Sequence, residues 1–242
     1  MQQRTQDGTQ DRTQDRTKER HQRRSGASAA MVRFRTVTSL ALLSLVLTVG
    51  AQAADAGAFD AAFRAFAQAA AGDDGAIDTA ASGFEALRTA EPANPVVVAY
   101  AGASTTMRAK KALAPLDKMA RAEDGLALLD KSLAMLTPAH DAPIEHGTPG
   151  SLEVRFVAAN TFLGVPSFMN RGARGRKLLD DVLASPLLEH APLPFQGNVW
   201  MRAAELAVKD RRADDARRWL NQIVARQAPQ AERARAMLKE LA

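Results

Sequence analysis

The sequence predicts an all-α fold, in which about nine helices form an array of helical hairpins and the last helix caps the array. Apolar residues recur at steps of three and four from Ala54 to the C-terminus, which is the spacing of one helix face. No stretch alternates apolar and polar residues over the length that a β-strand requires. Alanine is abundant, and Ala, Leu, Arg and Glu lose little conformational freedom when they enter a helix.

A polar tract precedes this pattern and cannot contribute to a core. Residues 1–30 contain a four-residue repeat, TQDG-TQDR-TQDR-TKER, which has no apolar side chain. Such a segment buries nothing, so we expect it to be disordered. We expect translation to start at Met31 rather than at Met1, because a hydrophilic extension before an export signal is unusual.

A secretory signal peptide is predicted at residues 31–53. Arg33 and Arg35 precede an apolar run of ten residues, Leu40–Val49, and Ala51-Gln52-Ala53 provides the small residues of a cleavage site. The run is short for a membrane-spanning helix. We therefore expect a periplasmic or secreted protein that is cleaved near residue 54 and keeps no stable membrane span. The alternative is that the apolar run is retained as an anchor.

The basic character of the chain lies in these first residues. The chain has 32 Lys or Arg and 27 Asp or Glu, and the first 53 residues hold nine of the basic and four of the acidic side chains. Residues 54–242 are left with 23 of each, so the predicted helical domain is formally neutral. A neutral domain gives no electrostatic argument for binding a phosphate backbone, and we expect no nucleic-acid partner.

Four helices are expected before a Pro-rich segment at residues 138–151. Asp73-Asp74-Gly75 breaks the chain between the first two helices, and Asn94-Pro95 suits a helix start because Pro fits the first turn. The residues that mark these helices are, in chain order, Phe59, Phe63 and Phe66; Phe84 and Leu87; Val98, Ala101 and Thr105; Leu126, Leu129, Leu133 and Leu136.

Five helices are expected after this segment. Residues 138–151 hold three Pro and two Gly and form the longest loop, and we expect Ser151 to cap the next helix. The residues that mark these helices are Leu152, Phe156, Ala159 and Phe162; Leu178, Leu179, Val182 and Leu183; Trp200, Ala203, Ala204 and Ala207; Ala216, Trp219, Leu220 and Val224; and Ala231 to Leu241. Because Tyr100, Trp200 and Trp219 fall at helical spacing, we expect them in the core rather than in a ligand groove.

Two parts of this pattern resemble tetratricopeptide repeats. In that family the second helix of each hairpin carries a small residue, a large apolar residue four positions later and a Pro eight positions after that. This sequence has Ala80, Phe84 and Pro92 at that spacing. Near the C-terminus the fuller pattern is matched, with the Pro one residue late, by Trp200, Ala204, Ala216, Leu220 and Pro229.

The resemblance covers residues 60–138 and 198–229 and is weak between them. A strict 34-residue step from Ala80 or Phe84 fails in the middle, where it reaches Thr148 and Pro186. The middle units therefore contain insertions and deletions, or they are hairpins of another kind. The resemblance implies that the first helices of successive hairpins hold a peptide or partner protein, and that residues 230–242 cap the array.

A basic segment at the start of one helix is the predicted partner-binding site. Arg171, Arg174, Arg176 and Lys177 surround two glycines there. A helix N-terminus attracts anions and arginines grip carboxylates in two-point fashion, so this segment suits an acidic partner. The alternative is a solvated basic edge whose charges pair with Asp180 and Asp181.

No catalytic, cofactor or metal site is predicted. His140, Asp141, Glu145 and His146 cluster in the Pro-rich loop, but their spacing is not that of a metalloprotease and no third ligand group is in view. We expect a solvated loop there. The chain has no Cys and no G-x-S-x-G motif, so the sequence offers no marked nucleophile.

The sequence therefore predicts a periplasmic helical-repeat scaffold, not an enzyme, that binds a protein or peptide in a cell-envelope assembly or transport system. The first alternative is a small-ligand-binding protein or an enzyme whose site lies near the loops at 138–151 and 166–177. A second alternative is a structural partner of the inner membrane that is held by an uncleaved apolar segment.

Overall fold

The computed structural model of the chain describes residues 57–144 and 146–241, and it confirms the all-α prediction. These residues form nine α-helices and four short 3-10 helices, and their only β-type pairing is an isolated bridge between Pro143 and Pro149. The predicted polar extension and signal peptide lie outside the described residues. Within those residues, every helix is too short or too polar to cross a membrane.

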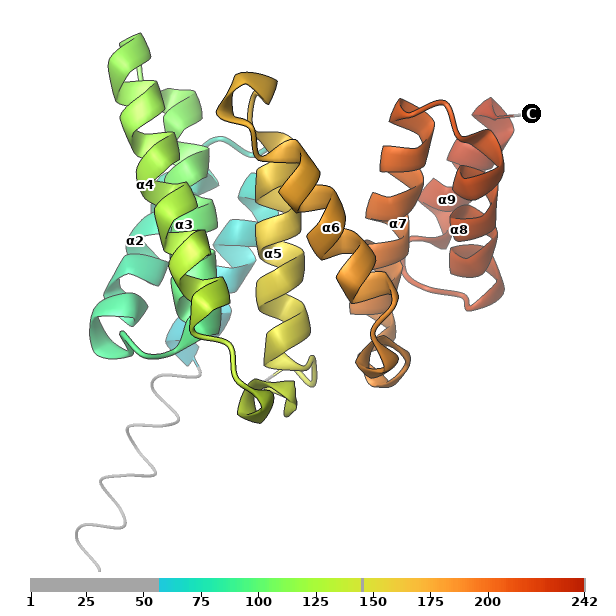
Figure 1. The fold of residues 1–242 in the computed structure, drawn as a ribbon, viewed down its shortest axis with the longest axis horizontal. Coiled ribbons are helices and arrows are strands. Elements are labelled where there is room, and N and C mark those ends of the chain that lie inside the picture. The colour runs from blue at the N-terminus through green and yellow to red at the C-terminus, as the bar shows by residue number, and fades with distance from the viewer. Residues whose placement is uncertain (1–56, 145, 242) are drawn as a thin grey trace, which may run out of the picture. The chain divides into compact units, whose positions relative to one another are not determined.

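The helices follow one another through short connections (Figure 1). The first helix occupies residues 57–70. The other α-helices are α2 (Ala76–Ala90), α3 (Pro95–Arg108), α4 (Pro115–Ala134), α5 (Gly150–Gly164), α6 (Gly172–Leu183), α7 (Leu193–Lys209), α8 (Ala213–Ala225) and α9 (Ala231–Glu240). The 3-10 helices are η1 (Ala109–Lys111), η2 (Pro138–Asp141), η3 (Ser167–Met169) and η4 (Pro186–His190).

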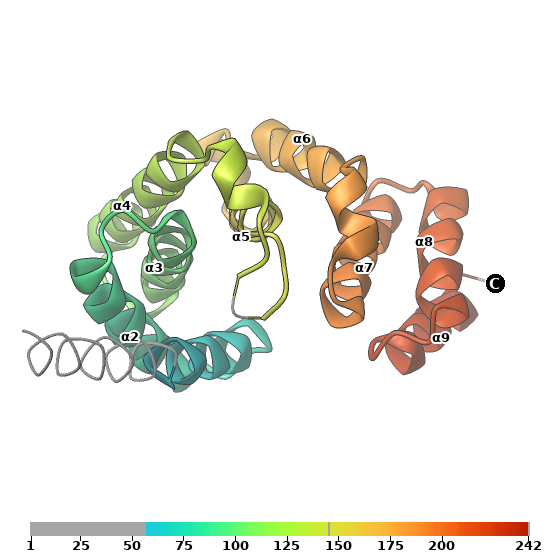
Figure 2. The ribbon, with the colours of Figure 1, turned by 90° about the horizontal axis from the view of Figure 1, so that it is seen from below.

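Consecutive helices pack as hairpins, as the sequence predicts. The pairs with the most extensive contacts are α3 with α4, α5 with α6, and α7 with α8, and the first helix packs on α2 through Phe59 and Phe84. Two rows result: a first-helix row of residues 57–70, α3, α5, α7 and α9, and a second-helix row of α2, α4, α6 and α8. Figure 2 shows α3 and α5 on the inner side of α4 and α6.

The helix starts show how local sequence sets the boundaries. Helix α3 starts at Pro95 as expected, and Asn94 caps it, since the Asn94 Oδ1 accepts hydrogen bonds from the amides of Val96 at 3.0 Å and Val97 at 3.4 Å. The expectation for Ser151 is wrong. Helix α5 begins at Gly150, with Pro149 at the cap position two residues before Ser151, and the Ser151 hydroxyl donates to the Asp141 carboxylate instead.

The core runs along the array from the first helix to α9 as clusters that share partly buried residues such as Leu178 and Trp219. Of the residues that match the tetratricopeptide pattern, the two prolines, Pro92 and Pro229, are exposed and the others are buried: Ala80, Phe84, Trp200, Ala204, Ala216 and Leu220. Tyr100 is also buried, and Trp219 is partly buried and packs against two of the clusters, so the prediction that Tyr100, Trp200 and Trp219 serve the core is confirmed. Membership of the tetratricopeptide family remains a prediction.

Candidate functional site

The predicted basic segment lies at the start of α6, where two of its arginines reach back to α4. Arg171 Nη1 is 3.0 Å from Asp130 Oδ2, and Arg174 Nη1 is 2.5 Å from Asp130 Oδ1. Both guanidinium groups also lie over the ring of Phe162 in α5, at 5.5 and 5.3 Å from its centroid. These cation–π contacts and ion pairs fasten the start of α6 to the two preceding helices.

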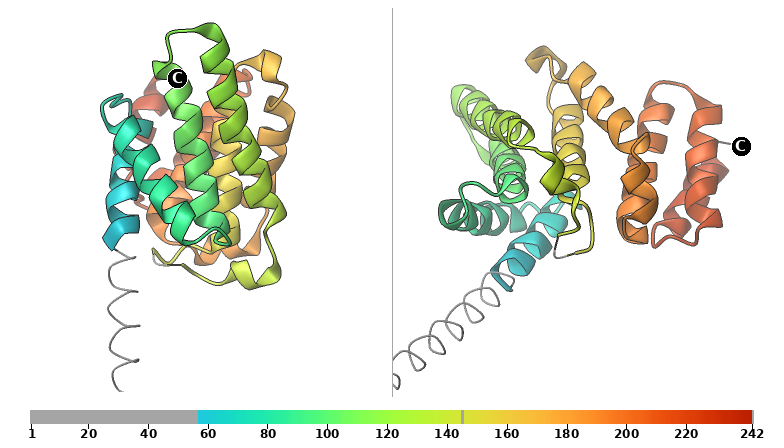
Figure 3. Two further views of the ribbon diagram at one scale, coloured as in Figure 1. Left: turned by 90° about the vertical axis from the view of Figure 1, so that its left-hand side faces the viewer. Right: turned by 60° about the horizontal axis from the view of Figure 1, so that its bottom comes forward.

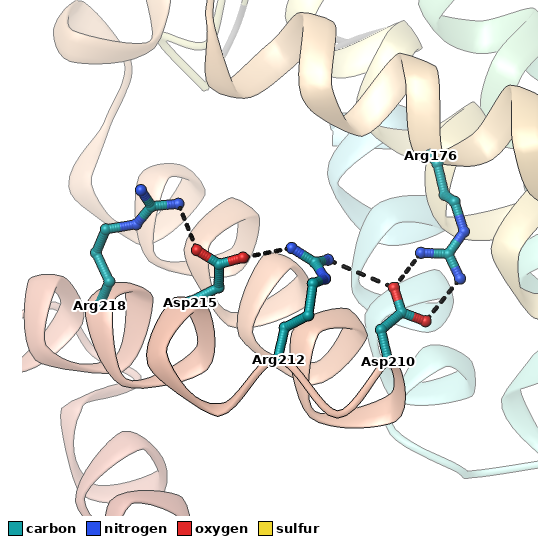
Figure 4. A network of polar contacts seen from close by, with 5 residues as sticks. All are labelled: Arg176, Asp210, Arg212, Asp215 and Arg218. Carbon is teal, nitrogen blue, oxygen red and sulfur yellow. Dashed lines mark hydrogen bonds and ion pairs between the residues drawn. The ribbon is translucent and has the colours of Figure 1, made fainter.

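The next arginine begins a chain of ion pairs toward α8 (Figure 4). Arg176 Nη2 donates to Asp210 Oδ1 at 2.8 Å, and this contact holds the pKa of the Asp210 carboxyl below its usual value. Arg212 bridges Asp210 and Asp215, and Arg218 completes the chain at 3.3 Å from Asp215. The chain joins α6 to the turn between α7 and α8.

The structure therefore gives every residue of the predicted site a partner within the chain. Lys177 pairs with Asp181 at 2.8 Å, as the alternative interpretation expects. The three arginines instead pair with aspartates that are 34 to 44 positions away in the sequence. These ion pairs are exposed or half-exposed, so each contributes on the order of 0–1 kcal/mol to stability. Binding of an acidic partner by this segment stays a prediction.

The side chains of the Pro-rich loop do not gather at one point. The amide of Thr137 donates to His140 Nδ1 at 3.0 Å, Asp141 accepts from Ser151, and Glu145 lies outside the described residues. In the part of the chain that the structure describes, no three His, Asp or Glu side chains are grouped for metal binding. The loop instead turns back on itself, because the Ile144 amide donates to the Thr148 carbonyl at 2.9 Å.

We call residues 142–144 and 146–149 the strap, because His146 among them lies against the first helix. His146 Nε2 is 3.5 Å from Asp60 Oδ1, and its ring centroid is 5.5 Å from that of Phe59 and 5.0 Å from that of Phe63. The strap thus occupies the first-helix row at its N-terminal end. No sequence signal marks this contact, since Asp60 and His146 are 86 positions apart.

A buried tyrosine–carboxylate pair lies near the strap. Tyr100 in α3 donates its hydroxyl hydrogen to Glu153 Oε1 in α5 at 2.5 Å, and both residues are only 4% exposed. Burial raises the pKa of the Glu153 carboxyl, while the Tyr100 hydrogen bond and the nearby His146 act in the opposite direction. Burial and the Glu153 charge raise the pKa of Tyr100, which keeps the hydroxyl protonated as the donor.

Replacing Tyr100 with Phe is expected to destabilise the protein more at neutral pH than at acidic pH. Because the pKa of Glu153 is raised in the folded state, its burial costs no stability at a pH below the pKa of the unfolded chain. The cost appears as the pH rises through the folded-state pKa and the buried carboxyl ionises. Loss of the Tyr100 hydroxyl removes a hydrogen bond that favours the ionised form of Glu153. We expect this loss to lower the free energy of unfolding by about 1–3 kcal/mol at neutral pH. Urea unfolding of Tyr100→Phe and the parent at pH 4 and pH 7.5 measures the difference.

The control for that experiment is Glu153→Gln, which keeps a hydrogen-bonding group without a charge. In the Glu153→Gln background, removal of the Tyr100 hydroxyl should cost the same amount at both pH values. Equal costs at both pH values in the parent background would show that the carboxyl is not ionised in the folded state over that range.

The first-helix row carries a second polar cluster at its C-terminal end, which we call the C-terminal polar face. Its residues come from α7 and from the start of α9: Asn198, Arg202, Glu205, Gln230 and Arg233. Glu205 accepts from Arg202 at 3.5 Å and from Arg233 at 2.6 Å, while Gln230 Nε2 donates to Asn198 Oδ1 at 2.7 Å. The spacing 198, 202, 205 places the α7 members on one side of the helix.

Two atoms of this face lack a hydrogen-bond partner. Among the described residues, three buried side-chain N or O atoms are unpaired: Ser104 Oγ, Arg202 Nε and Gln230 Oε1. Two of the three therefore belong to the C-terminal polar face. Both atoms are buried, and Gln230 Oε1 faces Gly197, where a Cβ would lie 2.0 Å from it, so the accessible groups of this face are the two guanidinium groups and Glu205. Sequence reasoning did not single out these residues.

Comparison of the chain with protein-family models, with curated proteins and with solved structures finds no match in any of the three.

Proposed function

We propose that the chain is an exported helical-repeat scaffold that binds a protein or peptide partner, in a cell-envelope assembly or transport system. The observation that carries the proposal is the C-terminal polar face, where the exposed Arg233 and the partly exposed Arg202 both contact Glu205 at one end of a row of packed helical hairpins. A peptide with carboxylate side chains can bind these guanidinium groups in the two-point fashion that arginine favours.

The position of this face supports the proposal. At the N-terminal end of the first-helix row, His146 of the strap packs on Phe63, whereas at the C-terminal end α7 and α9 present polar side chains, of which Asn198 and Arg233 are exposed. Arg202 and Arg233 both contact Glu205, so an acidic group of a partner can replace this carboxylate at the guanidinium groups. A partner segment with carboxylates therefore fits this face best.

The expected test result is loss of one partner when the face is altered. Arg202→Ala with Arg233→Ala should reduce recovery of the partner at least about tenfold, which corresponds to about 1.4 kcal/mol of binding free energy. The measurement is quantitative co-purification of the tagged full-length chain from the envelope of its own host.

The matched control is Arg218→Ala with Arg235→Ala, which removes two exposed arginines from α8 and α9 outside the face. This variant should recover the partner as the parent does. A partner that both double variants lose equally, or that neither loses, would place the binding surface elsewhere on the chain.

The alternative is a small-ligand-binding protein or an enzyme with its site near the 138–151 and 166–177 loops. One observation favours it, namely the buried Tyr100–Glu153 pair near the strap. A metabolite or metal that co-purifies with the parent and is lost in Glu153→Gln would support this alternative and count against the scaffold.

A further inference from the structure

Large apolar side chains are exposed at the tip of the α3–α4 hairpin, residues 108–121. Leu113 is 98% exposed, Leu116 is 81% exposed and Met119 is 42% exposed. They are three of the five large apolar side chains that are exposed in the described part of the chain. Leu116 and Met119 lie three residues apart in the first turns of α4, and Leu113 precedes the helix by two residues.

These side chains have no role in packing. Helix α4, with 20 residues, is the longest of α2 to α9, and it carries the tip beyond the ends of the neighbouring helices (Figure 1 and the left view of Figure 3). None of the three belongs to a core cluster or packs against one. Exposed apolar side chains that gather at one place indicate an interaction surface rather than a folding requirement.

The tip is also the site of a strong local charge. Residues 108–121 contain five basic side chains, Arg108, Lys110, Lys111, Lys118 and Arg121, and one acidic side chain, Asp117. The net charge of +4 contrasts with the formal neutrality of residues 54–242 as a whole. Among the described residues, Arg108 and Lys111 form the ion pairs of the tip and Lys110, Lys118 and Arg121 form none, so these three cations are available to an anionic partner.

A polar cavity lies at the base of the tip. It has a volume of about 210 Å³ and is lined by Asp78, Arg108, Lys111, Ala112 and Arg121. Asp78 neutralises part of this charge, since it pairs with Arg108 at 3.2 Å and with Lys111. The three cations and one carboxylate of the lining leave a net charge of +2, which suits an anionic group that enters from the solvent side.

We propose that the α3–α4 tip docks on a lipid bilayer whose surface carries anionic headgroups. Leu113 and Leu116 enter the boundary of the hydrocarbon region, and Met119 follows them to a smaller depth. Lys110, Lys118 and Arg121 remain at the level of the headgroup phosphates, because long basic side chains keep their charge in the polar layer.

The geometry favours a bilayer over a protein as the occupant of the tip. A stable protein interface involves about 20–30 residues on each side, whereas the exposed apolar set here is three side chains at the end of a projecting hairpin. A fluid bilayer accepts a projecting tip without a complementary hollow. Attraction between a basic surface segment and anionic lipids adds to the few inserted side chains.

This inference goes beyond the proposed scaffold function. Docking uses residues 108–121, while the C-terminal polar face lies on α7 and α9. A scaffold attached through one hairpin tip keeps its other surfaces available for a protein partner. The two proposals use separate residues, so that either can fail without the other.

The absence of Cys from the chain allows a test that reports on the tip alone. Leu116→Cys in the full-length chain, as its host processes it, is labelled with an environment-sensitive fluorophore. The probe is a vesicle of phosphatidylcholine with about 30% phosphatidylglycerol, a content that gives the strong negative surface required. We expect a blue shift and an intensity gain with these vesicles, and much smaller changes with pure phosphatidylcholine vesicles.

The matched control is Ala139→Cys, an exposed position in η2 beyond the opposite end of α4, about 30 Å along the helix from the tip. Its label should not respond, even if an apolar N-terminal segment binds the vesicle. Lys110→Glu with Lys118→Glu should weaken the Leu116→Cys response about tenfold, and this loss should shrink in high salt.

Two outcomes overturn the proposal. One is a label at position 116 that is unaffected by anionic vesicles, or that responds no more than the label at position 139. The other is a label at position 116 that responds to a protein of the envelope but not to its lipids, which would assign the tip to a protein partner.

Discussion

Ala216→Arg is expected to destabilise the protein by several kcal/mol, at least about 4, because it places a long charged side chain at a fully buried position. Ala216 lies in α8 with no exposed surface, in the hairpin whose fully buried residues include Ala204 and Leu220. In a domain of this size, such a loss lowers Tm by roughly 10 °C. Thermal unfolding followed by circular dichroism measures it.

The control is Ala225→Arg, which makes the same substitution at an exposed position in the last turn of α8. A cation near a helix C-terminus is favourable, so this variant should melt at the temperature of the parent or slightly above it. If both variants melted together, the α7–α8 packing described above would be wrong.

Helix α8 is an example of what can be predicted about the fold from the sequence, namely which face of a helix is buried. Spacing alone predicts that Ala216 and Leu220 lie in the core, and both are fully buried. The helix starts at Asn94-Pro95 and after Asp73-Asp74-Gly75 also agree with the structure, because capping and turn formation depend on neighbouring residues. Local rules therefore predict the order and the approximate bounds of the helices.

Contacts between distant residues are not predictable in the same way. Arg176 pairs with Asp210 and His146 with Asp60, over 34 and 86 positions, and these partners follow from the packing of helices. The misplaced cap at Ser151 has the same origin, since Asp141 reaches that hydroxyl only when η2 and α5 are packed together. The basic segment is visible in the sequence because its charged residues are neighbours in the chain. The α3–α4 tip and the C-terminal polar face are not, because they are defined by exposure and by contacts between helices.

Gly125 also shows that contacts between distant residues are not predictable from the sequence, and its replacement by Ala is the second substitution for which we expect a large loss of stability. A glycine inside a helix normally costs about 0.5–1 kcal/mol relative to alanine, so sequence alone suggests that Gly125→Ala stabilises α4. In the structure, a Cβ at Gly125 would lie 2.5 Å from the carbonyl oxygen of Gly102 and 2.7 Å from the amide nitrogen of Thr106, both in α3. These are backbone atoms, which cannot move aside as the end of a side chain can.

We therefore expect Gly125→Ala to destabilise the protein by about 3 kcal/mol, since forced separation of packed elements outweighs the gain in helix propensity. Gly172→Ala is the matched control, because a Cβ at Gly172, in the first turn of α6, meets no atom within 4 Å. That variant should be neutral or more stable by up to about 1 kcal/mol. The urea unfolding midpoints of both variants, compared with that of the parent, show whether each substitution stabilises or destabilises the protein. A stabilising Gly125→Ala would mean that α3 and α4 cross at a greater distance than the two glycines indicate.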